Sequence, residues 1–336
     1  MPSPLVLHLV GSPLDDFYRS LSHGYAQSCL WNTEKVASLR NYLIAYITPD
    51  GQWRFPYSLW TEHVDAAEPM SLSSAIKYIK TRNINVVIPH MYCFPGMTHY
   101  RALLDLLNIP YIGNTPHVMA IAAHKGRTRA IVAAAGVKVP LGELLREGDV
   151  PTILPPAVVK PASADNSLGV SFVRQTDGYD AALKKAFEHG TEVMVETFIE
   201  PGREVRCGCI VKDGELVALP LEEYFVNAQD KPIRTHEEKF TDYAVDFAQK
   251  HWMLSSSDPI SEKVQEMAKK CHLALNCRHY SMFEFRIDPN GEPWFLEACL
   301  YCSFGPGGGL SEMANTGGIS LGDLITIMIR EAVKKI

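Results

Sequence analysis

The first part of the chain alternates apolar runs of strand length with stretches of helical periodicity. Residues 4–12, 41–51 and 84–92 are rich in Val, Leu, Ile and Tyr, and they predict buried strands. Residues 71–83 have helical spacing with a serine suited to the N-cap, and residues 99–113 predict a helix that leads into a strand. Strands that alternate with helices predict a parallel sheet covered by helices.

Parallel sheets of this kind bind ligands at the carboxyl ends of their strands. Gly11-Ser12 and the segment from His90 to Gly96 follow predicted strands, so we expect a site there. Sharp turns without any function would give the same pattern.

The pattern changes after residue 117, where strands and hairpins with long loops begin. We therefore predict an N-terminal parallel α/β domain over residues 1–117, a central unit over 118–196 and a C-terminal unit over 197–336. The central unit opens with an Ala-rich helix that ends at Gly136. The C-terminal unit contains two hairpins and ends with helices over 261–275 and 320–336.

The second hairpin of the C-terminal unit, "SMFEFRIDPNGEPWFLEA", sets two acids against each other. Asn290-Gly291 predicts a type I′ turn, which requires a positive φ at both residues. Counting from that turn gives the facing pairs Phe283/Ala298, Phe285/Leu296, Ile287/Trp294 and Glu284/Glu297. Facing carboxylates repel, and a Mg²⁺ ion with its preference for oxygen ligands would remove the repulsion. The alternative is a solvated hairpin face softened by Arg286.

Composition and charge exclude several classes of protein. The 336 residues are 46% apolar and 21% charged, as in globular proteins, and the net charge of -6 argues against a nucleic-acid surface. No apolar run approaches the roughly 20 residues of a membrane span. The eight cysteines, without a basic leader at the start, predict reduced thiols in the cytoplasm.

A loop of small polar residues follows Lys160, at 162–169, and includes Ser163 and Ser167. Backbone N–H groups of such a loop can hold phosphate oxygens, with the lysine as cation. The loop has no Walker A pattern. A surface hairpin loop beside a solvated lysine is the alternative.

In this order, the segments "HKGRTRAIVAAAGVKVP", "PAVVKPASADNSLGVSFV", "VMVETFIEPGRE", "HEEKF" and "FRIDPNGEPWFLEA" resemble those of ATP-grasp ligases of the D-alanine–D-alanine ligase type. The resemblance implies an α/β and α+β architecture, in which an N-terminal Rossmann-like domain precedes an ATP-grasp fold. It implies an enzyme that uses ATP and Mg²⁺ to form a carbon–nitrogen bond.

The resemblance also implies a role for each matching residue. Lys125, Lys160, Ser163 and Ser167 would contact phosphates, and Lys239 would meet them from the other side, with Lys160 and Lys239 acting in catalysis. Glu196, Phe198, Ile199, Glu204 and Leu296 would hold the adenosine, and Glu284 and Glu297 would ligate Mg²⁺.

Other positions depart from the family pattern. Cys299 stands where the family has a metal-binding Asn, and Met282 stands where it has an Arg that polarises the acyl group. The substrate segments read "LYCSFGPGGGLSEM" and "PHMYCFPGMTHY", without the family's motifs.

These departures and the first residues are similar to the ligases of mycosporine-like amino acid biosynthesis. That resemblance implies mycosporine-glycine as acceptor and serine or threonine as amine. His90, Tyr92, Tyr301, Gly307 and Gly308 would contact the substrate, in an aromatic pocket that includes Phe94 and Phe304. The alternative for these aromatics is a place in the core.

Other functions stay open at this point. A D-alanine–D-alanine or related dipeptide ligase is one, and an ATP-binding regulatory protein without catalysis is another. Zinc bound by Cys207, Cys209, Cys299 and Cys302 fits no known spacing, and burial in the core is the expected alternative. The family implies small-molecule substrates and a homodimer, without a nucleic acid or a membrane as partner.

Overall fold

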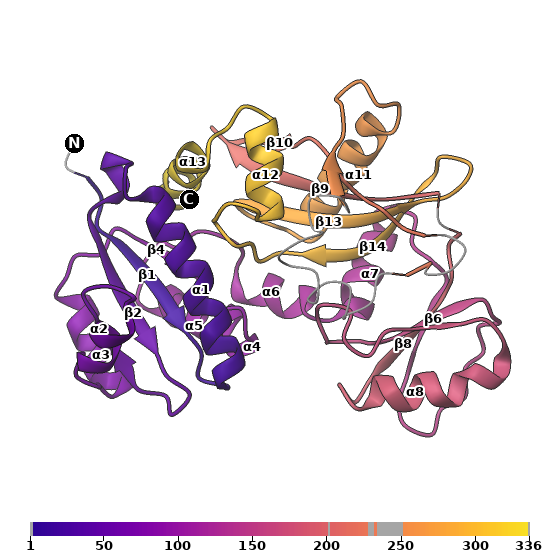
Figure 1. Cartoon of the computed structure of the whole chain (residues 1–336), viewed down its shortest axis with the longest axis horizontal. Coiled ribbons are helices and arrows are strands. Elements are labelled where there is room, and N and C mark those ends of the chain that lie inside the picture. The colour runs from indigo at the N-terminus through magenta and orange to yellow at the C-terminus, as the bar shows by residue number, and fades with distance from the viewer. Residues whose placement is uncertain (1–2, 201, 228–231, 234–250, 335–336) are drawn as a thin grey trace.

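The computed structural model describes residues 3–200, 202–227, 232–233 and 251–334. Lys239, predicted to meet the nucleotide phosphates, lies outside the described residues. The chain forms three sheets, which follow one another along the sequence (Figure 1). Most of the strands and helices predicted from the sequence are present at the expected positions.

The first sheet has four strands in the order β3-β2-β1-β4. Its central strands are parallel, as predicted, with Val6 beside Tyr42 and Val86. The strands are β1 (Val6–Gly11), β2 (Tyr42–Ile47), β3 (Trp53–Arg54) and β4 (Val86–Pro89). The helices around it are α1 (Asp16–Thr33), η1 (Ala37–Leu39), α2 (Thr61–Ala66), α3 (Leu72–Lys80), α4 (Phe94–Met97) and α5 (His99–Leu106). Ser71 caps α3 as predicted, since its hydroxyl accepts from the Ser74 N–H.

The second sheet has four antiparallel strands in the order β5-β8-β6-β7. It comprises β5 (Gly142–Leu145), β6 (Ala157–Pro161), β7 (Ser171–Val173) and β8 (Val193–Thr197). After a short turn η2 (Thr176–Gly178), helix α8 (Tyr179–Phe187) packs on it through Tyr179, Ala182 and Ala186.

The third sheet is six-stranded, in the order β12-β11-β9-β13-β14, with β10 paired to β9. Its strands are β9 (Arg203–Lys212), β10 (Glu215–Ala218), β11 (Glu222–Tyr224), β12 (His251–Met253), β13 (Tyr280–Ile287) and β14 (Pro293–Cys299). Helix α11 (Ser261–Ala274) packs against one face, and the same apolar cluster includes residues of α6 (Pro116–Ala122) and α7 (Lys125–Ala134). These two helices therefore pack on the third sheet, although the sequence assigns them to the central unit. The domain division itself stays a prediction.

The C-terminal helices join the first sheet to the third. Residues of α12 (Gly309–Thr316) and α13 (Leu321–Val333) share one buried cluster with Val6 and Ile88 of the first sheet and Tyr280 and Met282 of β13. This packing fixes the N-terminal domain beside the third sheet (Figure 1).

The β13–β14 hairpin corrects the predicted turn and part of the predicted register. Only Gly291 of the turn pair has a positive φ, +78°, and the Asp288 N–H donates to the Glu292 carbonyl, which closes a three-residue loop. Near the turn Phe285 therefore faces Phe295 and Ile287 faces Pro293, so the predicted pairs Phe285/Leu296 and Ile287/Trp294 are wrong.

A β-bulge then restores the predicted register. The shift falls between Glu284 and Phe285, where Leu296 is the extra residue of β14, and Glu284 faces Glu297 as predicted. Without the bulge, successive side chains of β14 would alternate between the two faces of the sheet. With it, Leu296 and Glu297 both line the same cleft.

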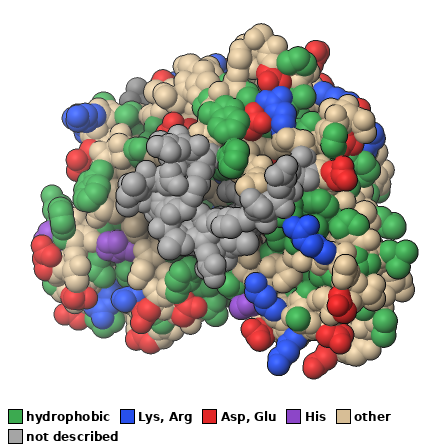
Figure 2. All heavy atoms as spheres, turned by 45° about the vertical axis from the view of Figure 1, so that its right-hand side comes forward, with side chains coloured by type: hydrophobic (Ala, Val, Ile, Leu, Met, Phe, Trp, Pro, Cys, Tyr) green, Lys and Arg blue, Asp and Glu red, His purple; other side chains and the backbone are tan. Residues whose placement is uncertain are grey.

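Among the described residues, no helix combines the length and the hydropathy needed to cross a bilayer. Acidic and basic side chains are interspersed on the face drawn in Figure 2.

Candidate active site

A cleft lies between the second sheet and the β13–β14 hairpin, with an empty volume of about 780 Å³ that includes its open mouth. The lining includes most of the residues predicted for the nucleotide and the metal: Lys125, Lys160, Ser167, Glu196, Ile199, Glu204, Glu284, Leu296 and Glu297. Segments that are far apart in sequence thus converge as the resemblance implies.

The predicted phosphate loop connects β6 to β7 along one side of the cleft. Asn166 and Ser167 have φ values of 55° and 58°, and the Leu168 N–H donates to the Asp165 carbonyl over 3.1 Å, which makes a type I′ turn. Gly169 follows at φ +70°. Ser167 lines the cleft, whereas Ser163 is exposed and lies outside the lining residues.

Lys125, the first residue of α7, ties this loop to the metal hairpin. Its Nζ lies 2.9 Å from Glu297 Oε1 and also donates to the Ala164 carbonyl. Burial acts to lower the pKa of Lys125, but the negative charges of Glu297 and Asp165 outweigh it, so the pKa is raised. The lysine stays charged in the cleft, where a phosphate could replace these partners.

Lys160 and Glu196 form a buried ion pair on the floor of the cleft. Lys160 Nζ lies 2.5 Å from Glu196 Oε2, and Arg129 approaches the other oxygen at 3.9 Å. The predicted phosphate lysine and the predicted adenosine acid are therefore direct neighbours. A carboxylate has more acceptor sites than one lysine occupies, so Glu196 can still accept a hydrogen bond from a ligand.

Three of the other predicted adenosine residues gather around Arg286. Its Nη2 lies 2.7 Å from Glu204 Oε2, its Nη1 donates to the Ile199 carbonyl over 3.3 Å, and its guanidinium lies 5.4 Å from the Phe198 ring centre. Arg286 therefore does not soften the repulsion between the two hairpin acids, contrary to the sequence alternative. It fixes Glu204 at the edge of the cleft.

Each of the two facing carboxylates has its own cation in this structure. Arg206 Nη2 lies 2.5 Å from Glu284 Oε1, and Lys125 holds Glu297. The side chains of Glu284 and Glu297 are 14% and 30% exposed, so the alternative of a solvated hairpin face is wrong. Two carboxylates that face a cleft beside lysines fit a divalent cation and its oxygen ligands.

Cys299 does not extend this ligand set. Burial raises the pKa of its thiol to about 12, so at neutral pH it is a neutral sulfur donor. Mg²⁺ prefers oxygen, so the residues present fit one cation between Glu284, Glu297 and phosphate oxygens better than two.

The residues predicted to contact the substrate fall into separate groups. The Tyr92 ring lies 5.0 Å from Tyr25 and 5.8 Å from Tyr301. Burial and the charge of Asp165 raise the pKa of Tyr301 well above its usual value, so this aromatic group adjoins the phosphate loop. Phe304 is 1% exposed and belongs to the core, as the alternative expected, while Phe94 is 48% exposed.

The glycine tract lies where α12 begins. Gly307 has φ +75°, and a Cβ at Gly308 would lie 2.7 Å from the Ser303 carbonyl oxygen. Both positions therefore require glycine for the local backbone conformation, whether or not a substrate is bound.

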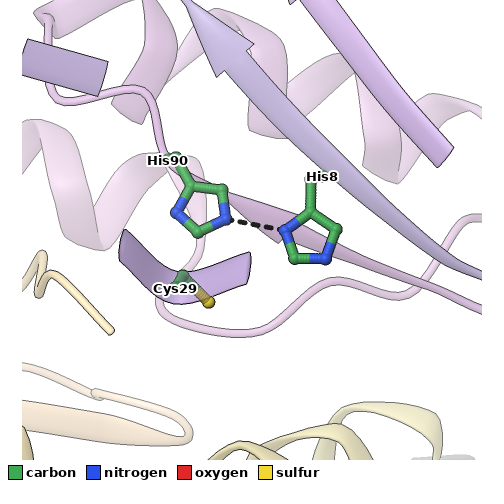
Figure 3. A group of neighbouring side chains, drawn as sticks. All are labelled: His8, Cys29 and His90. Carbon is green, nitrogen blue, oxygen red and sulfur yellow. Dashed lines mark hydrogen bonds between the residues drawn. The ribbon is translucent and has the colours of Figure 1, made fainter. Parts of the chain in front are cut away.

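His90 is fully buried away from the cleft. Its Nε2 lies 3.0 Å from Nδ1 of His8 in a stacked pair beside Cys29 (Figure 3). Burial lowers the pKa of His90 well below its usual value and that of His8 to about 3, so both rings are neutral. The structure thus gives His90 a place in the core of the N-terminal domain and no access to a substrate.

The four cysteines considered for zinc do not form one group, although Cys207 and Cys209 are neighbours. Cys207 and Cys209 belong to the cluster under α11, and Cys302 belongs to the cluster under α13. In the described part of the chain, the group of His, Cys and acidic side chains that converges closely enough for a metal is His8, Cys29 and His90, which contains none of the four.

Arg206 and Arg129 contact the predicted site, but the sequence analysis missed them. Arg206 reaches Glu284 because β9 pairs with β13, 78 residues away. No local pattern predicts such a pairing, although an Arg two residues after Glu204 on a strand must share its face.

Comparison with known proteins identifies the family. Residues 147–330, more than half of the chain, match the family model described as "D-ala D-ala ligase C-terminus". The chain is 30% identical over 240 residues to the D-alanine–D-alanine ligase of Citrifermentans bemidjiense, which covers 70% of this chain and 74% of that protein. The chain belongs to the D-alanine–D-alanine ligase family. The ligase of Agrobacterium fabrum is 31% identical over 245 residues, 69% of this chain and 75% of that protein.

Solved structures show the same fold at lower identity. The VanG D-Ala:D-Ser ligase from Enterococcus faecalis superposes with a TM-score of 0.80 and 21% identity, over 98% of this chain and 99% of that chain. The predicted ATP-grasp fold is therefore confirmed. Family membership also confirms the predicted enzyme class, an ATP-dependent carbon–nitrogen ligase, and its cofactors, ATP and Mg²⁺.

The narrower prediction of a mycosporine-glycine–amine ligase is wrong by the same comparisons. The relatives at about 30% identity are D-alanine–D-alanine ligases. The departures from the family pattern, Met282 and Cys299 among them, predict another acceptor, and the comparisons contradict that prediction. The alternative of a regulatory protein without catalysis is not supported either.

Proposed function

We propose that this chain is an ATP-dependent ligase that joins two small amino acids, with D-alanine–D-alanine or a closely related dipeptide as product. The observation that carries the proposal is the 30% identity to a D-alanine–D-alanine ligase over 70% of the chain. The convergence of Lys125, Lys160, Glu284 and Glu297 on one cleft supports it.

The residue roles are those that the family resemblance implies, and the lining of the cleft supports most of them. Lys125, Lys160 and Ser167, with Ser163 and Lys239 as further members of the predicted set, would hold the phosphates. Glu196, Glu204, Phe198, Ile199 and Leu296 would hold the adenosine, and Glu284 and Glu297 the cation. When bound, the nucleotide and its cation supply a phosphoryl group and positive charge, which together turn a carboxylate oxygen into a leaving group.

The chain itself contributes position and charge. Lys125 bridges the phosphate loop and the hairpin, so it keeps the two walls of the cleft in register. The loop closes one side of the cleft, which favours attack by an amine over attack by water. Most of the rate enhancement in such a site comes from preorganised charge.

The test is a phosphate-release assay on the purified chain with ATP, Mg²⁺ and single amino acids. Phosphate release that requires D-alanine, together with a product of the mass of D-alanyl-D-alanine, is the expected result. L-alanine serves as the control, and D-serine tests a mixed dipeptide. If no D-amino acid raises phosphate release above the blank, the proposal is refuted.

A further inference from the structure

A row of charged side chains crosses the third sheet beneath the cleft. Glu222 of β11, Arg206 of β9, Glu284 of β13 and Glu297 of β14 are direct neighbours in register on four successive strands. Lys125 ends the row at Glu297. Cations and acids alternate along the row except at Glu284 and Glu297, where the divalent cation is expected.

Arg206 is the central cation of this row. Its Nη2 and Nε lie 2.5 and 3.2 Å from Glu284 Oε1, and its Nη1 lies 3.5 Å from Glu222 Oε2. The ring of Tyr224 supports the guanidinium at 5.0 Å from the ring centre. Burial acts to lower the pKa of Arg206, but Tyr224, Glu284 and Glu222 outweigh it and raise the pKa, so the charge is permanent.

The guanidinium of Arg206 has a close backbone neighbour in the glycine tract. A Cβ at Gly309 would lie 3.0 Å from Arg206 Nη1 and 3.4 Å from Met282 Sδ. The guanidinium therefore lies against bare backbone at the start of α12, and its side chain is still 16% exposed. The row thus continues from the nucleotide cleft to the glycine tract at 305–309.

A divalent cation bound by Glu284 weakens the hold of this carboxylate on Arg206, because two cations then share one negative charge. Both guanidinium donors that Glu284 holds now, Nε and Nη2, donate to Oε1, so these are the contacts that the sharing weakens. A buried cation without its partner is costly, and a guanidinium matches a carboxylate with two parallel hydrogen bonds. Glu222 remains beside Nη1 and keeps Arg206 in place.

We propose that Arg206 binds the carboxylate of an amino-acid substrate, and that this binding becomes available when the nucleotide and its cation take Glu284. The proposal rests on the proposed function and deepens it. It makes nucleotide binding and amino-acid binding cooperative, and the coupling must be reciprocal. In the free enzyme, Arg206 acts as a counter-ion that competes with the divalent cation for Glu284.

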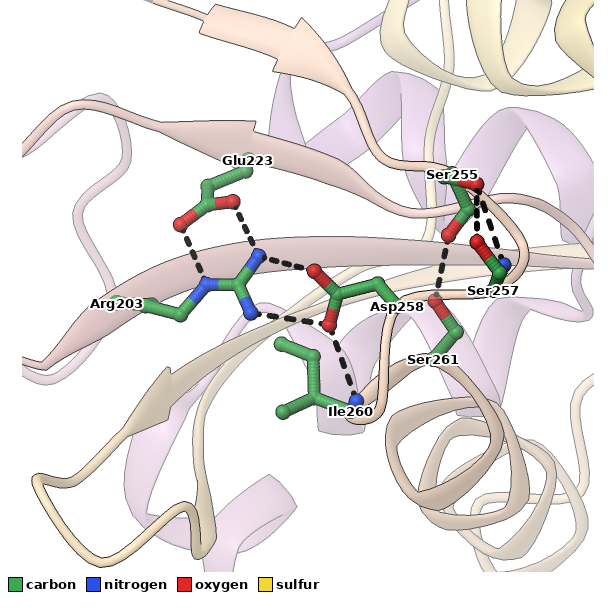
Figure 4. Close-up of polar contacts among 7 residues, drawn as sticks. All are labelled: Arg203, Glu223, Ser255, Ser257, Asp258, Ile260 and Ser261. Atoms are coloured by element: carbon green, nitrogen blue, oxygen red, sulfur yellow. Dashed lines mark hydrogen bonds and ion pairs between the residues drawn. The ribbon is translucent and has the colours of Figure 1, made fainter.

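Arg203, three residues earlier on β9, provides the matched control. It lies on the opposite face of the sheet and pairs with Glu223 at 2.6 Å and with Asp258 at 2.9 Å (Figure 4). It has the same charge and a comparable ion-pair environment, but it faces α11 and not the cleft. Any effect of lost ion pairing alone should therefore appear in both arginines.

The experiment compares Arg206→Lys, Arg206→Met and Arg203→Lys with the wild type. In phosphate-release assays, Arg206→Lys should raise the KM for the amino acid about tenfold or more, because lysine cannot make the two parallel bonds, and should change the KM for ATP less than about threefold. Arg203→Lys should change neither value. An unchanged amino-acid KM in Arg206→Lys, or an equal effect in Arg203→Lys, overturns the proposal.

A second readout does not depend on turnover. Mn²⁺ binding without nucleotide, followed by electron paramagnetic resonance, should be about threefold or more tighter in Arg206→Met than in the wild type, because the competing guanidinium is gone. Equal Mn²⁺ affinity in both would overturn the counter-ion role. If the wild type shows no phosphate release with any D-amino acid, the proposed function fails, and the Mn²⁺ comparison still decides whether Arg206 competes for Glu284.

Discussion

The phosphate loop can be disturbed by a single methyl group at Gly169. An L-residue at φ +70° costs about 1–2 kcal/mol. The added Cβ would lie 2.6 Å from His189 Cδ2 and 2.8 Å from Pro161 Cγ. The histidine can turn away, but the proline ring on β6 cannot, and such overpacking costs about 1–3 kcal/mol. Gly169→Ala should therefore cost about 2–5 kcal/mol in total, the sum of these two ranges.

The loop is the part of the fold that yields to this strain, because it lies at the edge of the second sheet. Its displacement moves Ala162 and Ala164, whose carbonyls accept from the Lys125 backbone N–H and from Lys125 Nζ. We expect the affinity for a non-hydrolysable ATP analogue with Mg²⁺ to fall at least about tenfold, which is about 1.4 kcal/mol, and the melting temperature to fall by several degrees.

Gly51→Ala is the matched control, since Gly51 has φ +77° and nothing lies within 4 Å of its added Cβ. Gly51→Ala should show only the free-energy cost of the positive φ, without a steric clash, at a position far from the cleft. Calorimetric titration and thermal unfolding of both variants separate the two contributions. If Gly169→Ala binds the analogue like the wild type and melts no lower than Gly51→Ala, the reasoning about the loop is refuted.

Three further predictions follow from the charges of the site and of the core. Glu297→Gln should lower turnover at least about 100-fold with little change in melting temperature, because it removes both the attraction to Lys125 and the repulsion from Glu284. The control is Glu292→Gln, at the exposed turn of the same hairpin, which should keep full turnover in the phosphate-release assay. Near-normal turnover in Glu297→Gln would refute the metal role. Lys125→Met should weaken nucleotide binding in calorimetry but tighten Mn²⁺ binding without nucleotide, because Lys125 holds Glu297 in the free enzyme; weakening of both would contradict this competition. Urea unfolding midpoints should fall steeply below pH 6.5, because burial lowers the pKa of four buried histidines, that of His272 to about 4. The unfolded chain therefore takes up protons that the folded chain does not. Each histidine then lowers the free energy of unfolding by up to about 1.4 kcal/mol per pH unit. The four histidines are His8, His90, His272 and His279. His272→Gln should flatten this dependence by one proton, and equal midpoints at pH 7.5 and 5.5 would contradict the assignment.

The sequence predicts well what depends on neighbours along the chain. The parallel strands, the cap at Ser71 and the end of α7 before Gly136 follow from periodicity and from turn residues. The first of the two predicted hairpins is present too, as β9 and β10, and its turn at Asp213-Gly214 has φ values of 55° and 87°. In each case a local conformational preference and the fold agree.

What depends on pairing across the chain was predicted less well. The predicted pairing of Glu284 with Glu297 is correct only because the register shift from the three-residue turn is reversed by the bulge at Leu296. The sequence predicts neither the turn length nor the bulge. The cations that pair with the two acids, Arg206 and Lys125, come from other elements of the fold. The sequence offers only the neighbouring Arg286 as a cation, because it does not show which distant segments lie beside the hairpin. His90 was misplaced because an apolar strand end does not reveal which face is buried.

The claim on which the account depends is that Glu284 and Glu297 together hold a divalent cation against the nucleotide. The direct measurement is electron paramagnetic resonance of Mn²⁺ with a non-hydrolysable ATP analogue labelled with ¹⁷O at the phosphates. We predict phosphate-dependent line broadening in the wild type that is lost in both Glu284→Gln and Glu297→Gln. Broadening that persists unchanged in both variants would show that the cation binds elsewhere and would contradict the account.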